Sequence, residues 1–289
     1  MHRTRQTACL TALSSAVPRV GLKVVLAASM ILGFGQIACA AGNPVAPAAR
    51  HGLTQSVQSA SIPIGEHSIN VNVADTGADV TFIRLHEDEM PAGTVGVQMN
   101  REVPSRFIDL SQRRDRNISF ALSGTRYTFD PNSIFTGGVA PITYGARLSP
   151  AATKATTGLA ETITGLLLPG APVIALHNNR GTLLASYASG PFKKYTHAVY
   201  VNRAMDASTF AVVPTRSLFE AVKNLGINVV WENRAGTNDD GSLLAYAQRN
   251  NIPYVNIETA LGSSAQAQLD IVRQMVPLVQ AEALAIRGM

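Results

Sequence analysis

Cysteine is nearly absent from this sequence, and none occurs after residue 40. The two cysteines, Cys9 and Cys39, both lie in the first 40 residues. A chain without them forms no disulfide, has no thiolate nucleophile and binds no metal through sulfur. Any metal ion held by residues 41–289 must therefore be bound by histidine, aspartate or glutamate.

Long apolar runs are also missing. The longest near the N-terminus is "VVLAASMILGFG" (24–35), and a membrane-spanning helix needs about 20 residues. A basic segment precedes this run, and small residues at Ala38 and Ala40 follow it. This order predicts a secretory signal peptide over residues 1–40. Gln36 argues against lipid attachment at Cys39. We expect a periplasmic or secreted protein with no stable membrane anchor.

Only 15% of the residues are charged, and most of the excess of positive charge lies in the signal segment. Four basic residues lie there without any acid, so the net charge falls from +5 for the whole chain to +1 after residue 40. A nearly neutral mature chain lacks the basic excess of a nucleic-acid-binding protein, and we expect no nucleic-acid partner.

Residues 41–60 are rich in Ala, Pro, Ser and Gln and have no period, which predicts a flexible lead-in. Residues 61–289 then alternate strand and helix patterns, which predicts a single α/β domain with a mixed, mostly parallel central sheet flanked by helices. The expected strands are 68–75, 79–86, 172–179, 209–215, 227–233 and 253–259, with a hairpin at 117–130; the expected helices are 149–170, 216–226, 241–251 and 263–286.

Three of these strands end in groups that can do chemistry: His86, His177 and Glu258. Active groups of α/β sheets lie beyond the carboxyl ends of strands. Taken singly, His177 could cap its strand, and Glu258 could accept hydrogen bonds from the loop that follows. Taken together, their shared position at strand ends favours one site.

The segment "RLHEDEMPA" (84–92) places His86 and Glu89 in H-x-x-E spacing. Such a run of acids is often a solvated loop, and the spacing alone is weak. With His177, however, the pair would supply two imidazoles and a carboxylate, a ligand set of catalytic zinc. Glu258 would then act as the general base beside the metal. We therefore expect Zn²⁺ as the cofactor.

The order of these motifs resembles that of the zinc carboxypeptidase superfamily. The series is His86 and Glu89, then "DPNSIF" (130–135), then His177 and Glu258. The superfamily includes compact deacylases similar to aspartoacylase and succinylglutamate desuccinylase, and peptidases that trim peptidoglycan. The resemblance implies a zinc-carboxypeptidase-like fold, zinc bound by the two histidines and Glu89, and a catalytic role for Glu258.

One position departs from that pattern. The family has an arginine after the asparagine, and this chain has Ser133 after Asn132. The resemblance implies substrate binding at both positions, yet a hydroxyl lacks the fork of donors with which guanidinium grips a carboxylate. Arg116 or Arg126, which flank the predicted hairpin, could instead bind substrate or polarise its carbonyl. Each could also be a solvated hairpin residue.

We therefore expect an exported zinc-dependent amide hydrolase of the metallocarboxypeptidase or amidase type. Its substrate would be a small peptide, with the peptides of peptidoglycan as the first choice in a cell envelope, or an N-acyl amino acid. The alternatives are an N-acyl amino acid deacylase of the same fold and a non-catalytic envelope binding protein on this scaffold. The loss of the arginine at Ser133 favours the last of these.

Overall fold

The computed structural model describes residues 55–137, 140–181, 183–234 and 236–288. The predicted signal peptide, and residues 41–54 of the predicted lead-in, lie outside this part of the chain. Within it, no helix combines the length and apolar character needed to cross a bilayer.

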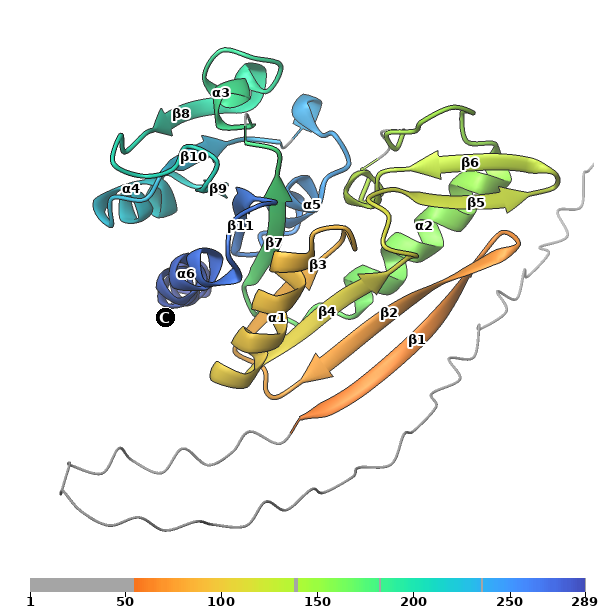
Figure 1. Cartoon of the computed structure of the whole chain (residues 1–289), viewed down its shortest axis with the longest axis horizontal. Coiled ribbons are helices and arrows are strands. Elements are labelled where there is room, and N and C mark those ends of the chain that lie inside the picture. The colour runs from red at the N-terminus through yellow and green to blue at the C-terminus, as the bar shows by residue number, and fades with distance from the viewer. Residues whose placement is uncertain (1–54, 138–139, 182, 235, 289) are drawn as a thin grey trace, which may run out of the picture.

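A mixed nine-stranded sheet forms the centre of the described chain, in the order β1-β2-β4-β3-β7-β11-β9-β10-β8 (Figure 1). Parallel pairing joins β4, β3, β7 and β11 in its middle, and the flanking pairs are mostly antiparallel. The bounds are β1 Ser56–Ile64, β2 His67–Asp75, β3 Val80–Arg84, β4 Ser105–Ser111, β7 Val173–Asn179, β8 Thr196–Tyr200, β9 Phe210–Val213, β10 Val229–Glu232 and β11 Tyr254–Ala260. The predicted α/β class with a mixed central sheet is confirmed.

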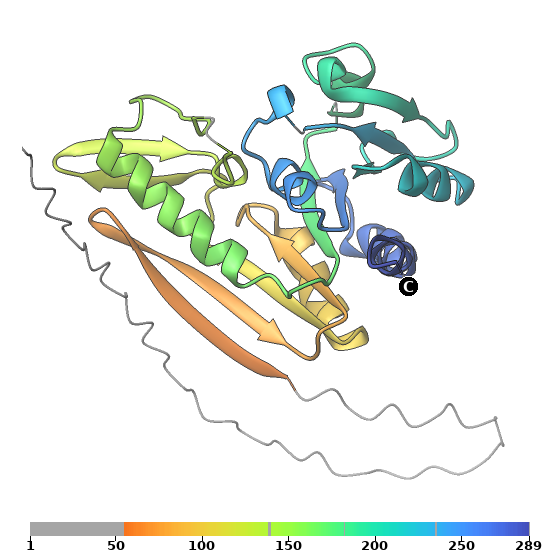
Figure 2. The same ribbon diagram turned by 180° about the vertical axis from the view of Figure 1, so that it is seen from behind.

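Helices cover both faces of this sheet. One face packs against α1 (Met90–Glu102), α4 (Arg216–Asn224) and α6 (Ala265–Ile286). The other packs against α2 (Pro150–Gly165), α3 (Leu183–Ala188), α5 (Leu243–Arg249) and the hairpin of β5 (Ile118–Leu122) and β6 (Thr125–Phe129). In Figure 2, α2 lies in front of the sheet. The sheet is thus the middle layer between two apolar cores.

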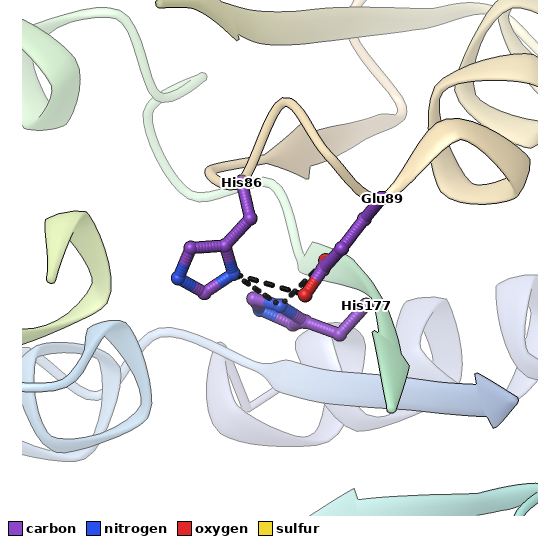
Figure 3. Close-up of side chains that lie close together, drawn as sticks. All are labelled: His86, Glu89 and His177. Atoms are coloured by element: carbon purple, nitrogen blue, oxygen red, sulfur yellow. Dashed lines mark hydrogen bonds and ion pairs between the residues drawn. The ribbon is translucent and has the colours of Figure 1, made fainter. Parts of the chain in front are cut away.

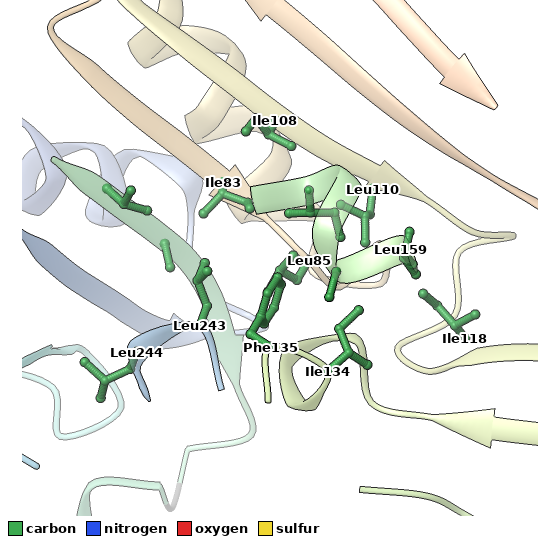
Figure 4. Packing of buried hydrophobic residues seen from close by; sticks show 14 of the residues in the cluster. Ile83, Leu85, Ile108, Leu110, Ile118, Ile134, Phe135, Leu159, Leu243 and Leu244 are labelled. Carbon is green, nitrogen blue, oxygen red and sulfur yellow. The ribbon is translucent and has the colours of Figure 1, made fainter. Parts of the chain in front are cut away.

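The central strands are buried on both faces, and their side chains alternate between the two cores. In β3, Phe82 packs on the α1 side and Ile83 on the α2 side. Figure 4 shows Ile83, Ile108 and Leu159 within the second of these cores. Fully burying such a side chain contributes roughly 1.5–3 kcal/mol, so the strands that carry the site are firmly held.

Among the helices and strands of the described residues, α1, β4, β1, α3 and β8 were not predicted from the sequence. Two glycines in α1, Gly93 and Gly96, weaken its helical pattern. Both are required by packing: a Cβ on Gly96 would lie 2.2 Å from the ring of Phe107, and one on Gly93 would lie 2.7 Å from the guanidinium of Arg84. The close approach of α1 to the sheet explains why the helix tolerates residues that disfavour it.

The lead-in prediction needs a correction, because β1 already begins at Ser56. Residues 56–60 pair with β2 along an antiparallel ladder and are not a flexible segment. The alternating pattern of "SVQSASIPI" is mostly polar, since most of β1 is exposed, and this hid the strand. The predicted hairpin turn is confirmed: Ser123 and Gly124 have φ of 51° and 74°, as a primed turn needs.

Candidate metal centre

His86, Glu89 and His177 lie together in the protein interior (Figure 3). Their ligand atoms all lie within 4.8 Å of one another. The Nδ1 of His86 is 3.1 Å from Oε1 of Glu89, and the Nδ1 of His177 is 3.1 Å from Oε2. All three side chains are almost fully buried. The structure thus brings the three predicted ligand residues to one point.

The neighbouring strands β3, β7 and β11 create this meeting point. Their carboxyl ends lie side by side, and His177 and Glu258 are register partners on β7 and β11. His86 follows β3 by two residues. Glu89 occupies the N-cap position of α1, but its side chain makes no capping bond. The Oδ1 of Asn178 accepts a hydrogen bond from the N–H of Ala92 in the first turn of α1, so this N–H does not need the Glu89 carboxylate. The Glu89 side chain can therefore face the histidines.

A largely buried ion pair supports the H-x-x-E segment. Arg84 and Asp109 are register partners on β3 and β4, and the guanidinium binds the carboxylate through two hydrogen bonds, of 2.6 and 3.1 Å. The remaining Nη1 of Arg84 donates to the carbonyl oxygens of Glu87 and Glu89 at 3.2 and 3.3 Å. Arg84 therefore holds in place the backbone that positions the Glu89 side chain.

Asp130 orients the ring of His86. Its Oδ1 is 2.8 Å from Nε2 of His86, and because a carboxylate only accepts, the ring nitrogen donates. This leaves Nδ1 to face Glu89 and His177. A carboxylate behind a histidine in this way fixes the tautomer of a metal-binding imidazole and raises its basicity. The sequence interpretation quoted Asp130 in its motif but gave it no role.

The charges of the group are strongly coupled. Burial lowers the pKa of His86, but the charge of Glu89 and the hydrogen bonds to Asp130 and Glu89 outweigh it and raise this pKa from 6.5 to about 9. Burial raises the pKa of Glu89, but the charges of His177 and His86 and their hydrogen bonds outweigh it and lower this pKa well below its usual range. At neutral pH, Glu89 is an anion and His86 is protonated.

These residues fit a bound metal ion. The two Nδ1 atoms are 3.3 Å apart and both face the Glu89 carboxylate, an arrangement that one cation between them would satisfy. Two imidazoles and a carboxylate are a ligand set that zinc uses when it keeps one position open.

Glu258 lies next to this group and is 7% exposed. Its carboxylate accepts from the side-chain amides of Asn179 and Asn256 at 3.3 and 3.2 Å. Burial raises the pKa of Glu258; the nearby His177 lowers it, and the charge of Glu89 raises it. The net shift is upward, toward the range in which a carboxylate can both accept and return a proton.

A cavity of about 270 Å³ opens beside the group. Glu258 and Arg116 line it together with Asp88, Arg180 and residues from the end of β7, from α3 and from the loop after β11. Its lining is polar and carries both signs of charge. A polar ligand in this cavity would touch the Glu258 carboxylate and the Arg116 guanidinium at once.

Of the two arginines predicted for the site, the structure brings only Arg116 to it. Arg116 Nη1 donates to Oε1 of Glu89 at 2.7 Å, and its side chain is 43% exposed. Arg126 does not reach the group: it pairs with Ala121 on the hairpin and lines a separate cavity with His67. The sequence could not separate the two, because Arg116 lies just before the hairpin and Arg126 lies in its second strand.

Asn132 and Ser133, predicted to bind substrate, make hydrogen bonds within the fold. The Oδ1 of Asn132 accepts from the N–H of Leu243 at the start of α5. The Ser133 hydroxyl donates to the carbonyl of Asp130 at 2.8 Å and accepts from the N–H of Ile142 at 2.9 Å. Neither residue lines the cavity beside Glu258. Their role in substrate binding stays a prediction.

No family model matches the sequence, and no curated protein matches it. Solved structures do match. An aspartoacylase family protein from Mesorhizobium loti is 14% identical with a TM-score of 0.40, over 81% of this chain and 67% of that chain. A succinylglutamate desuccinylase/aspartoacylase from Rhodobacter sphaeroides is 12% identical with a TM-score of 0.42, over 80% and 67%. The murein-tripeptide amidase of Escherichia coli O157 is 13% identical with a TM-score of 0.36, over 70% and 81%.

These matches include the two kinds of enzyme that the motif order resembles, aspartoacylase-type deacylases and a peptidoglycan amidase. The identities are 12–14% and the TM-scores do not exceed 0.42, so the similarity says nothing further about activity. The function proposed below therefore depends on the geometry of the site.

Proposed function

We propose that this protein is a zinc-dependent amide hydrolase of the metallopeptidase or amidase type. One observation carries the proposal: the buried group of His86, Glu89 and His177 adjoins Glu258 at the edge of a polar cavity. Two imidazoles, one carboxylate and a separate carboxylate with a raised pKa are the parts that metal-assisted hydrolysis requires.

Each residue has a distinct task in this scheme. When bound, zinc would act as a Lewis acid and lower the pKa of a water molecule. Glu258 takes the proton from the attacking water on its carboxylate and returns it to the leaving amine. Arg116 presents a guanidinium to the carbonyl or carboxylate oxygens of the substrate from the wall of the cavity.

We further propose that the substrate is a small peptide from peptidoglycan. Support comes from the predicted export signal and from a cavity whose lining carries Asp88, Arg116 and Arg180, which suits a zwitterionic peptide. An N-acyl amino acid would use the same chemistry, with a simple acyl group in place of the peptide on the carbonyl side of the bond that is cut. A panel of muropeptides and N-acyl amino acids, assayed with the zinc-loaded protein, separates the two by which bond is cut.

A non-catalytic binding protein is the second candidate. It is favoured by Ser133, whose hydroxyl bonds within the fold and lacks the guanidinium fork that grips a substrate carboxylate. The test is zinc analysis of protein purified without added metal, followed by the substrate panel. Near-stoichiometric zinc with hydrolysis supports the enzyme, and a protein with no affinity for zinc contradicts it.

Export makes a separate prediction. The mature protein should begin after Ala40, because the basic segment, the short apolar run and the small residues before that position have the order of a cleaved signal. N-terminal sequencing of protein recovered from the periplasm or the medium checks it. A chain that still begins at Met1 would remove the support for a peptidoglycan substrate.

Zinc affinity should depend steeply on pH. His86 in the metal-free protein has a pKa of about 9, so below this value zinc must displace a proton from it. The zinc dissociation constant should therefore fall by about tenfold per unit as pH rises toward 9 and level off above it. Chelator competition between pH 6.5 and 9.5 measures the slope, and a constant that does not change with pH contradicts the coupling.

A further inference from the structure

Residues 112–117, between β4 and β5, determine where Arg116 lies. This loop has neither helical nor strand structure, and it carries the guanidinium that contacts Glu89 at 2.7 Å. Because no regular element fixes the backbone of Arg116, the contact depends on the conformation of the loop.

That conformation is strained. Arg113 and Arg114 have φ of 64° and 60°, in the left-handed region that residues with a Cβ disfavour. Two such residues in succession persist only where surrounding contacts hold them. The loop therefore needs an anchor.

The anchor is the side chain of Glu87. Its Oε1 accepts from the hydroxyl of Ser111 at 2.9 Å, and its Oε2 accepts from the backbone N–H of Arg114 at 2.7 Å and from that of Gln112. These bonds bracket Arg113 on both sides. The Glu87 carboxylate thus holds the strained turn through three donors, two that precede Arg113 and one that follows it.

Gln112 carries the anchoring on to Arg116. Its side-chain amide donates to the carbonyl oxygens of Asp115 and Arg116 at 2.8 and 2.9 Å, which closes the loop on itself. A continuous set of hydrogen bonds therefore leads from Glu87 through the loop to the residue that contacts Glu89. Both ends of this set belong to the H-x-x-E segment.

We propose that Glu87 is a positioning residue, which delivers Arg116 to Glu89 by holding the turn at Arg113 and Arg114. Its effect on zinc rests on the proposed function, in which Glu89 is a ligand. A guanidinium on Oε1 of Glu89 withdraws charge from that carboxylate and places a cation beside the metal position. The pair therefore weakens zinc binding relative to a free Glu89.

The test compares zinc affinities of Glu87→Ala, Arg116→Ala and the double variant, by chelator competition with metal-free protein. Each single variant should bind zinc roughly tenfold more tightly than the wild type, on the scale of the repulsion between two cations a few ångströms apart in a partly exposed site. The double variant should match Arg116→Ala within about twofold, because Glu87 acts through Arg116. A purely structural role predicts the opposite sign, since a loosened site binds zinc less well.

Glycine at the two strained positions should restore the wild-type zinc affinity in the absence of Glu87. Adding Arg113→Gly and Arg114→Gly to Glu87→Ala should return zinc affinity toward the wild-type value, because glycine adopts positive φ without penalty. Asp206→Ala is the matched control: this carboxylate also accepts a loop N–H, that of Ser208 at 2.9 Å, and its loss should leave zinc affinity unchanged. If Glu87→Ala does not fold, Glu87→Gln keeps one accepting oxygen and should give an intermediate shift.

Crystal structures of the metal-free wild type and of Glu87→Ala test, without any zinc, whether Glu87 positions Arg116. We expect Arg116 within hydrogen-bond distance of Glu89 in the wild type and away from it in the variant. A wild type that binds no zinc would defeat the proposed function, and these two structures would still decide the role of Glu87. Weaker or unchanged zinc binding in Glu87→Ala, or an Arg116 that stays on Glu89, would overturn the inference.

Discussion

Replacing Glu258 with glutamine should leave zinc bound and remove turnover. Glutamine keeps the size of the side chain and one accepting oxygen for the amide of Asn179 or Asn256, but it cannot accept the proton of the attacking water. We expect turnover to fall by at least ~10²–10⁴-fold, the contribution typical of general acid–base catalysis. Metal analysis and hydrolysis of a substrate cleaved by the wild type measure the two effects separately.

Glu89→Gln is the control that distinguishes a base from a ligand. Its carboxylate lies between the two histidines, so its loss should reduce metal content along with activity. A Glu258→Gln protein that remains fully active would reject the mechanism, even with zinc present. A Glu258→Gln protein that loses its zinc would instead move this residue into the ligand set.

Loss of either histidine should empty the metal centre. His86→Ala and His177→Ala each remove one of three ligands from a buried site in which the described residues offer no substitute ligand within the group. We expect zinc content near zero after dialysis, and hydrolysis lost with it, because a catalytic zinc site needs three protein ligands to stay filled. Elemental analysis of dialysed protein is the measurement.

Two exposed histidines provide matched controls. His67→Ala and His197→Ala remove the same side chain from positions outside the group, and both should keep full zinc content. Circular dichroism confirms that all variants are folded. Full zinc content in the His86→Ala/His177→Ala double variant would disprove the ligand assignment and make His51, His67 and His197 the next residues to test.

Much of the site was predictable because the ends of the strands can be recognised from the sequence. His86, His177 and Glu258 each follow an apolar run, and in an α/β sheet such positions share one edge. The signal for Arg84 was also present: it is a charge in the otherwise apolar β3, and burial requires that it have a partner. That partner, Asp109, lies in a strand that the sequence interpretation did not assign.

The local sequence pattern failed to predict α1 and β1, because tertiary packing outweighed local propensity there. Helix α1 contains Gly93 and Gly96, which lower helix propensity, yet close packing on Arg84 and Phe107 requires them. Strand β1 is mostly exposed, so it lacks the apolar alternation that marks a half-buried strand. In both cases the deciding contacts come from residues distant in the sequence.

By itself, the sequence determined the α/β class, the strand ends and the residue types available for chemistry, because these depend on local periodicity and spacing. The tertiary structure decided which candidates meet. The β7–β11 register put Glu258 beside His177, and a strained loop held by Glu87 brought Arg116, and not Arg126, to Glu89. The tertiary structure also gave Asn132 and Ser133 hydrogen-bond partners within the fold, Leu243 and Ile142. Such outcomes depend on long-range pairing and backbone strain, which residue spacing does not encode.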